Sequence, residues 1–232
     1  MNDQMLADRL PDELPGDPMH WADAWIKEAM SANVRKNPNA LTLATVSDSG
    51  RPSARVVLCK RFVPDPGYFV VYTNYESRKT RELLANANVS AVFHWDSLGR
   101  QIRIDGTAVL SPESESDAYF ASREWGSQLG AWGSDQSRPV ESRAALLAQI
   151  RARGKSLGLK FGSDTASLDS ADVPDIPRPP HWGGIRIWAR AIELWINGVD
   201  RIHDRALWER DIVQASEHEF SVTPWTGTRL QP

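Results

Sequence analysis

Residues 185–205 read IRIWARAIELWINGVDRIHDR, and this stretch decides the fold. Bulky and polar residues alternate from Ile185 to Ile196, which is the period-two pattern of a β-strand. Asn197-Gly198 follows, a residue pair that tight hairpin turns favour. We therefore predict a hairpin whose second strand runs from Ile202 to Arg210.

Three residues after the predicted turn carry polar chemistry. Arg201, His203 and Arg205 are spaced by two, so a strand would place them on one face. Two guanidiniums that flank an imidazole suit a phosphate or a carboxylate. The same spacing is also typical of a solvated strand face, on which Asp200 and Asp204 would neutralise the arginines.

The rest of the sequence predicts a mainly β fold of antiparallel strands with flanking helices. Segments that are β-branched, aromatic or alternating are expected strands, and turn-like segments separate several of them. These strands are 41–46, 54–60, 68–72, 89–95, 101–110 and 220–229. Short connections between neighbouring strands favour a closed or partly closed barrel, because closure removes exposed edges. A dinucleotide-binding α/β fold is excluded, since no G-x-G-x-x-G follows a strand.

Helical periodicity predicts helices at 19–33, 78–87, 113–123 and 140–153, with Gly126 to Ser137 as a connection. Residues 1–18 are rich in Asp, Pro and Leu without periodicity, which predicts a mobile N-terminal arm. Residues 154–180 are polar and contain four prolines, which predicts a surface insertion. We expect residues 19–232 to form a single domain.

Composition limits the function classes. The chain has 232 residues, of which 41% are hydrophobic and 25% charged, and its formal net charge is -3. This balance argues against a general nucleic-acid or membrane surface. The single cysteine, Cys59, cannot form an internal disulfide and is expected to pack in a strand, and the sequence shows no signal peptide, so we predict a cytoplasmic protein. The histidine spacing suggests no metal ligands, and no metal is assigned.

Three further motifs combine cations with hydroxyl or phenol groups. The strand Arg55-Val-Val-Leu-Cys-Lys60 has a cation at each end, and Tyr119, Arg123 and Ser127 would stack on one face of a long enough helix. Arg78 and Lys79 open a predicted helix. Cations at the N-terminal end of a helix are unfavourable to its dipole unless an anion binds beside them. Each motif alone is also compatible with charged strand ends or a solvated helix surface. Together they predict at least two bound anionic groups.

In this order the motifs resemble the pyridoxamine 5'-phosphate oxidase family. The resemblance covers residues 41–232 and rests on Arg55-x-x-x-x-Lys60, Tyr72-Thr73, Ser77-Arg78-Lys79, Gln101, Tyr119-x-x-x-Arg123, Gln136-Ser137, Trp195 to Arg205 and the terminal Arg229-Leu-Gln-Pro232. It implies an antiparallel FMN-binding split barrel. It also implies a homodimer with two FMN clefts at the subunit interface, each built from both chains.

The resemblance also implies roles for individual residues. FMN-binding residues would be Arg55, Val56, Val57, Leu58, Cys59, Lys60, Tyr72, Thr73, Arg78, Lys79, Gln101, Gln136, Ser137, Trp195 and Arg205. Substrate-binding residues would be Lys60, Tyr119, Arg123, Ser127, Arg201 and His203, of which Arg201 and His203 are the expected catalytic pair. The implied reaction oxidises pyridoxamine or pyridoxine 5'-phosphate to pyridoxal 5'-phosphate, with dioxygen reduced to hydrogen peroxide.

Four departures from the family pattern keep other hypotheses open. Glu124-Trp125 replaces a Pro-basic pair, Ile196 replaces a glutamine, the N-terminal arm lacks an Arg-Arg-Glu-Tyr type of segment, and 154–180 is long. One alternative is a related FMN-dependent oxidase with a different substrate, such as a dihydrophenazine-type metabolite. Another is a non-catalytic protein that binds flavin or pyridoxal phosphate.

Overall fold

The structure is a computed structural model that describes residue 5, residues 8–161 and residues 175–232. Its contacts define two compact units, each assembled from separated stretches of the chain. Unit 1 comprises Met1–Val71, Glu82–Leu110 and Ile185–Pro232, and unit 2 comprises Tyr72–Arg81 and Ser111–Gly184. Two strands and one helix begin in one unit and end in the other.

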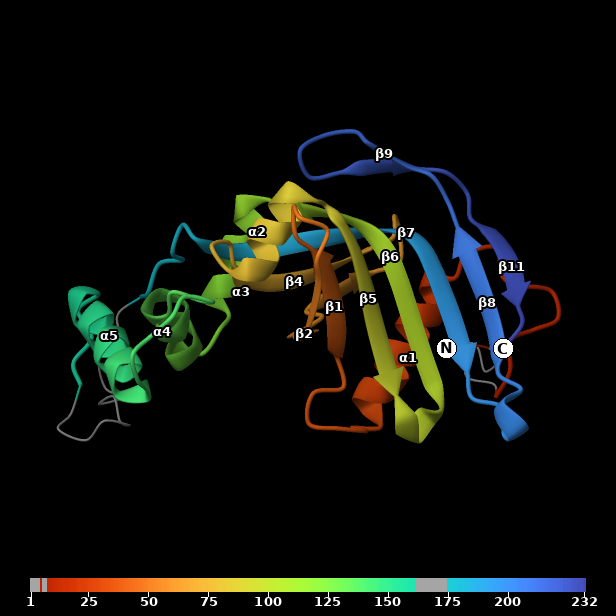
Figure 1. Cartoon of the computed structure of the whole chain (residues 1–232), viewed down its shortest axis with the longest axis horizontal. Helices are drawn as coiled ribbons and strands as arrows, with labels where there is room; N and C mark the ends of the chain where they lie inside the picture. Colours follow the sequence, from red (N-terminus) through yellow and green to blue (C-terminus); the bar gives the residue numbers. More distant parts are fainter. Residues whose placement is uncertain (1–4, 6–7, 162–174) are drawn as a thin grey trace. The chain divides into compact units, whose positions relative to one another are not determined.

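Strands dominate the chain (Figure 1). They are β1 (Ala40–Val46), β2 (Pro52–Leu58), β3 (Arg61–Val63), β4 (Tyr68–Asn74), β5 (Asn88–Trp95), β6 (Arg100–Leu110), β7 (Trp182–Ile196), β8 (Asp204–Glu209), β9 (Ile212–Gln214), β10 (Phe220–Val222) and β11 (Thr226–Leu230). The α-helices are α1 (Met19–Ser31), α2 (Arg78–Ala85), α3 (Glu113–Ala121), α4 (Trp125–Gly133) and α5 (Arg143–Ser156). Short 3₁₀ turns, η2 (Asp96–Leu98) and η3 (Val199–Arg201), follow β5 and β7.

Nine of the strands in the described residues form one sheet. The main path runs β11-β8-β7-β6-β5-β1-β2, while β3 pairs with β4 and β4 also pairs with β7. Neighbours along the main path are antiparallel, as are β3 and β4. The predicted antiparallel β fold with flanking helices is confirmed. β9 and β10 form a separate hairpin.

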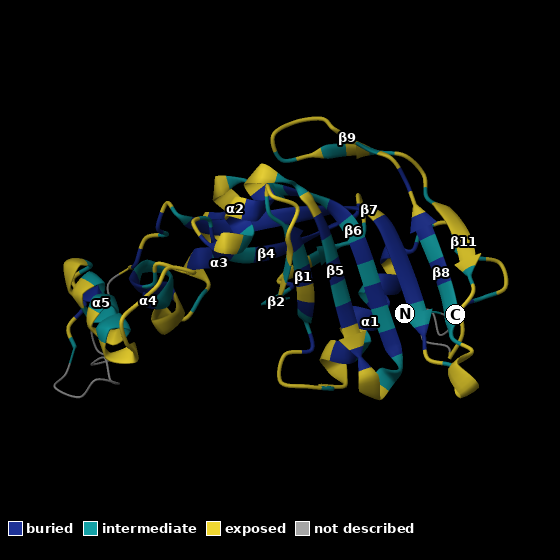
Figure 2. Ribbon diagram, in the orientation of Figure 1, coloured by how far each residue is buried: buried dark blue, intermediate teal, exposed yellow. Residues whose placement is uncertain are grey.

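The two faces of the sheet differ in polarity. Along β6 the burial alternates, as Figure 2 shows, because successive side chains point to opposite faces. Ile102, Ile104, Leu194 and Trp208 are each 0% exposed and belong to the core face. The other face of β6 and β8 carries polar residues such as Arg103 and is partly exposed.

Three buried tryptophans anchor irregular segments within unit 1. The indole Nε1 of Trp25 donates to Met5 O at 2.8 Å, that of Trp95 to Pro38 O at 2.7 Å and that of Trp208 to Pro15 O at 2.7 Å. A buried indole N–H needs an acceptor, and coil carbonyls lie free of strand pairing. Each ring therefore contributes both core packing and a tether for a loop.

The N-terminal arm predicted over residues 1–18 is anchored where it is described. Leu10 is 2% exposed, and its amide donates to Asp204 Oδ2 at 2.7 Å. Arg229 pairs with the same carboxylate and donates to Pro11 O at 2.7 Å. Hydrophobic burial and a charged acceptor thus hold a segment that has no periodicity of its own. Residues 1–4 and 6–7 lie outside the described residues.

Two other expected boundaries were wrong. The strand predicted over 220–229 is divided into β10 and β11, and Pro224 lies between them. Proline has no amide hydrogen to donate to a ladder, which explains the break. The predicted hairpin at Asn197-Gly198 is a longer turn, since β8 begins only at Asp204.

The predicted connection Gly126 to Ser137 contains helix α4. Its glycines suggested a loop, but Gly133 lies where α4 meets α5: a Cβ on Gly133 would lie 2.6 Å from Ile150 Cγ1 and 3.0 Å from its Cα. Close helix approach therefore explains this glycine better than turn formation does. The predicted insertion 154–180 begins inside α5, and its residues 162–174 lie outside the described residues.

Gly133→Ala should destabilise the protein. The new methyl group would meet the α5 backbone at Ile150, and overpacking of this kind typically costs about 1–3 kcal/mol. Gly130→Ala is the matched control, because nothing lies within 4 Å of a Cβ there and alanine favours the helix by about 0.5–1 kcal/mol. In urea unfolding, the midpoint should fall for Gly133→Ala and rise for Gly130→Ala. Equal midpoints for the two variants would contradict the close contact.

Candidate functional site

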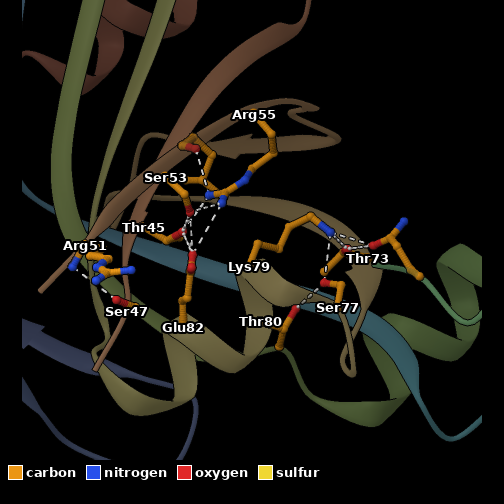
Figure 3. A network of polar contacts seen from close by, with 12 residues as sticks. Thr45, Ser47, Arg51, Ser53, Arg55, Thr73, Ser77, Lys79, Thr80 and Glu82 are labelled. Carbon is orange, nitrogen blue, oxygen red and sulfur yellow. Dashed lines mark hydrogen bonds and ion pairs between the residues drawn. The ribbon is translucent and has the colours of Figure 1, made fainter. Parts of the chain in front are cut away.

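In unit 2, Lys79 is the centre of a polar cluster (Figure 3). Its ammonium donates to Gln136 Oε1 at 2.6 Å, to Thr73 Oγ1 at 2.7 Å and to Ser77 Oγ at 2.9 Å. Thr73 comes from the end of β4, Lys79 from the first turn of α2 and Gln136 from the segment after α4. The structure thus brings together three residues that the sequence predicted for one site.

This cluster has the chemistry of a phosphate site. It combines an ammonium, two hydroxyls and a side-chain amide beside the N-terminal end of α2, where helix amides attract anions. Next to Gln136, Ser137 has a φ of 70°, a left-handed conformation that non-glycine residues rarely adopt. Arg78, also predicted for this site, is exposed at the same helix start. A phosphate-bearing cofactor fits these residues.

A second cationic group in unit 2 is Arg123. Its Cζ lies 4.5 Å from the ring centroid of Trp182 and 5.7 Å from that of Phe120. Its Nη1 is buried, and no hydrogen-bond acceptor reaches it among the residues that the structure describes. Burial lowers the pKa of Arg123, and the neighbouring Tyr119 opposes that shift. A buried guanidinium nitrogen without an acceptor is costly unless a ligand supplies one.

The predicted helical face of Tyr119, Arg123 and Ser127 was wrong. α3 ends at Ala121 and α4 begins at Trp125, so Arg123 lies in the link between two helices. Tyr119 instead stacks on Tyr72, with ring centroids 3.8 Å apart. Ser127 is exposed in the first turn of α4.

In unit 1, Arg55 is held by a network that Figure 3 also shows. Its Nη1 donates to Thr45 Oγ1 at 2.6 Å, and its Nη2 lies 3.4 Å from Glu82 Oε2. Glu82 is 6% exposed and also accepts from Ser53 Oγ at 2.6 Å. A buried carboxylate thus orients Arg55, the cation at the start of the strand that the resemblance predicted to line the flavin.

The remaining residues of that segment differ in exposure. Val56 is 67% exposed, Val57 and Leu58 are partly buried, and Lys60 is exposed beyond the end of β2. Cys59 is 6% exposed, and its carbonyl accepts from Asn39 Nδ2 at 2.7 Å. The protein therefore encloses the Cys59 side chain, in agreement with the packing role expected from the sequence.

Three predicted cofactor residues form one row across the sheet of unit 1. Gln101 on β6 is paired with Trp195 on β7, and Trp195 is paired with Arg205 on β8. Directly opposed residues of antiparallel strands share a face, so these side chains lie side by side on the polar face. The row was not foreseen, because register cannot be read from the separate motifs.

The predicted strand face of Arg201, His203 and Arg205 was wrong. Only Arg205 lies in β8, whereas Arg201 belongs to η3 and has a φ of 64°. The two sides of the turn approach each other closely at Gly198, since a Cβ there would lie 1.7 Å from Ile202 O. Positive φ at Arg201 changes the direction of the chain, so period two does not apply there.

The turn fixes the orientation of His203. The Gly198 amide donates to its Nδ1 at 3.2 Å, and its ring lies 4.6 Å from the ring of Trp195. Because Nδ1 accepts, the neutral ring carries its proton on Nε2. His203 can thus present its Nε2–H as a donor beside Trp195.

Four residues with site contacts were not among the predicted set. Ser77 and Glu82 bind predicted residues through side-chain oxygens, and Trp182 supports Arg123. Glu193 accepts from Arg205 Nε at 2.8 Å. Ser77 belongs to the Ser77-Arg78-Lys79 motif, but no role of its own was predicted for it. The others had no signal in the sequence, because each is separated along the chain from its partner.

The described residues show neither a metal-binding cluster nor a candidate membrane-spanning helix. They contain no cluster of three or more His, Cys, Asp or Glu side chains arranged to bind a metal ion. No helix within them has the length and apolar character needed to cross a membrane.

Family models match most of the chain. Residues 26–154 match the model described as pyridoxamine 5'-phosphate oxidase. Residues 182–232 match the pyridoxine 5'-phosphate oxidase C-terminal dimerisation region. Similar proteins include the pyridoxine/pyridoxamine 5'-phosphate oxidases of Burkholderia mallei (strain SAVP1) and Burkholderia thailandensis. Each is 47% identical over 210 residues, which are 90% of this chain and 86% of the relative.

Solved structures agree with this fold. PhzG from Burkholderia lata 383, in complex with tetrahydrophenazine-1-carboxylic acid, is 31% identical with a TM-score of 0.76 and covers 95% of both chains. A pyridoxamine 5'-phosphate oxidase-related, FMN-binding protein from Nostoc punctiforme is 15% identical with a TM-score of 0.63, covers 93% of this chain and 98% of its own, and supports the fold alone.

The antiparallel sheet and these matches define the class of protein, a split-barrel oxidoreductase. The chain belongs to the pyridoxamine 5'-phosphate oxidase family.

Cys59 should be unreactive in the native protein. Burial raises the pKa of its thiol to about 12, outweighing the lowering effect of its hydrogen bond to the Arg61 backbone. A disulfide reagent at about pH 8 should label Cys59 only after unfolding, because the thiolate is the reactive form. Since the unfolded thiol ionises at lower pH, stability should fall as pH rises from about 9. Rapid labelling of native protein would contradict this burial.

Proposed function

We propose that this protein is an FMN-dependent oxidase that converts pyridoxamine or pyridoxine 5'-phosphate to pyridoxal 5'-phosphate. The observation that carries the proposal is the buried Nη1 of Arg123, which lacks an acceptor among the described residues. A phosphate monoester supplies a negatively charged acceptor, and its oxygens match the planar geometry of a guanidinium. The 47% identity to oxidases named for these substrates supports the same reading.

We assign the FMN phosphate to the Lys79 cluster. Lys79, Thr73, Ser77 and Gln136 would exchange their mutual hydrogen bonds for bonds to phosphate oxygens. When bound, FMN would accept a hydride from the substrate carbon that bears the amine or alcohol, and would pass two electrons to dioxygen to give hydrogen peroxide. For the amine substrate, the oxygen atom of water replaces the amine nitrogen, which leaves as ammonia.

The chain's own contribution is orientation. His203, held by Gly198 and Trp195, would donate from Nε2 to the substrate, and Arg201 would close over it from the exposed turn. Holding the reacting carbon against its hydride acceptor is proximity catalysis. In this assignment His203 acts as a hydrogen-bond donor rather than as a base.

We also propose a cytoplasmic homodimer. The C-terminal match is a dimerisation region, and Val199 and Ile202 in the same region are 84% and 73% exposed. Apolar side chains this exposed favour a protein partner. The polar face of β6–β8 would then be covered by cofactor and by the second chain.

A related oxidase acting on a reduced phenazine carboxylate is the second candidate. It is favoured by the 31% identity to PhzG, and by Glu124-Trp125, since Trp125 is 37% exposed beside the Arg123 link. Ile196 carries little weight, because it is 5% exposed and points away from the face of Trp195. A carboxylate could also accept from Arg123, so the phosphate must be tested directly.

Arg123→Ala should raise the KM for pyridoxamine 5'-phosphate by about 10- to 100-fold, because charge-assisted hydrogen bonds contribute about 1.5–3 kcal/mol. Any turnover of unphosphorylated pyridoxamine should change little. Steady-state peroxide production measures both substrates.

The control is Arg143→Ala, which removes an exposed cation from the same unit. An unchanged KM for the phosphorylated substrate in Arg123→Ala would refute the phosphate assignment. Oxidation of a dihydrophenazine carboxylate in place of pyridoxamine 5'-phosphate would favour the second candidate.

Lys79→Met should weaken FMN binding by about 10- to 100-fold, since it removes the charge that meets the phosphate. Riboflavin, which has no phosphate, should bind both proteins equally. Flavin fluorescence quenching gives both dissociation constants, and exposed Lys155 provides the control variant Lys155→Met. Equal losses for FMN and riboflavin would show that Lys79 acts on folding instead of on the phosphate.

A further inference from the structure

Glu193 lies on the same sheet face as the row formed by Gln101, Trp195 and Arg205. It is two residues before Trp195 on β7 and is paired with Arg103 on β6. Residues two apart on a strand share a face, so Glu193 and Arg103 form a second row beside the first. No contact of this second row was expected from the sequence.

The Glu193 carboxylate binds two arginines from the strands on either side. Its Oε1 accepts from Arg205 Nε at 2.8 Å and Nη2 at 2.7 Å, and its Oε2 accepts from Arg103 Nη2 at 3.0 Å. The Glu193 side chain is only 4% exposed. One buried anion therefore holds two guanidiniums that would otherwise repel each other.

Arg205 is oriented before any ligand arrives. Two of its nitrogens bind Glu193, and the third, Nη1, donates to Gln231 O at 3.0 Å. These contacts fix the plane of the guanidinium beside Trp195, the residue paired with Arg205 on β7. A fixed guanidinium loses less conformational entropy when it binds a ligand.

We propose that Glu193 is a positioning residue that orients Arg205 and sets the charge of the flavin-binding row. This inference rests on the proposed function, because Arg205 is a flavin contact only in that assignment. The Glu193 carboxylate offsets one of the two positive charges carried by Arg205 and Arg103. Its removal should both loosen Arg205 and make the flavin environment more positive.

Asp105 provides a matched comparison. It lies on the same face of β6 and binds Arg103 Nη1 through Oδ2 at 3.0 Å, as Glu193 binds the other end of that guanidinium. Its contact is with Arg103 rather than with Arg205, and its side chain is 27% exposed against 4% for Glu193. Asp105→Asn therefore removes the same charge from the same face without releasing Arg205.

The test compares Glu193→Gln, Glu193→Asp and Asp105→Asn with the wild-type protein. Three quantities are measured: the FMN dissociation constant, the midpoint potential of bound FMN, and the thermal unfolding temperature of the FMN-free protein. Glu193→Gln should weaken FMN binding by about tenfold, the lower end of what is lost when outer partners of ligand-binding groups are removed. Its potential should become more positive, because reduction adds negative charge.

Glu193→Asp keeps the charge and shortens the side chain, so its potential should stay near the wild-type value while FMN binding weakens. It also serves if Glu193→Gln does not fold. Asp105→Asn should change FMN binding less than twofold, as expected for a partly exposed charge.

The outcomes separate the two proposals. If wild-type protein binds no FMN, the proposed function fails. If wild-type protein binds FMN and Glu193→Gln matches Asp105→Asn in affinity and potential, while differing only in unfolding temperature, Glu193 is merely structural and this inference alone is overturned.

Discussion

The antiparallel register of β6, β7 and β8 is the constraint on which the site in unit 1 depends. β7 has 15 residues and is paired with β6 on one side and β8 on the other. Because opposed residues share a face, one register places Ile102, Leu194 and Ala206 in the core, where each is 0% exposed. The same register puts the polar partners side by side on the opposite face. A slip of one residue would bury Arg103 and expose Ile102, so hydrophobic burial indirectly aligns the functional row.

The contacts of the predicted site cations differ between the two units. In unit 1, Arg55 and Arg205 each bind a buried carboxylate, Glu82 and Glu193. In unit 2, Lys79 donates to three neutral oxygens, and Arg123 lies over the Trp182 ring. A carboxylate fixes the geometry of a guanidinium and offsets its charge, whereas hydroxyl and amide oxygens orient an ammonium, and aromatic rings support a guanidinium, without adding a negative charge.

Tryptophan side chains hold several irregular segments of the described residues in place. Trp25, Trp95 and Trp208 each bury a large ring and bind a coil carbonyl through Nε1. In unit 2, Trp132 donates to Pro177 O at 2.7 Å in the same manner. Such contacts combine hydrophobic burial with a directional bond, so a loop without periodicity acquires a defined position. The N-terminal segment near Leu10 is held in this way together with the Asp204 carboxylate.

The sequence by itself determined most strands, most helices and a set of candidate site residues, because period-two and period-3.6 patterns and short motifs are local. α1 begins at Met19 as predicted, and Thr73, Lys79 and Gln136, which the family resemblance assigned to one site, are in contact. Tertiary structure decided what depends on distant partners. Gly133 lies in a helix because α5 packs against it, Arg201 leaves the strand because the turn at Gly198 is tight, and Glu193 becomes an arginine anchor only through the pairing of three strands. Register and helix contact join residues far apart in the chain, and no local pattern encodes them.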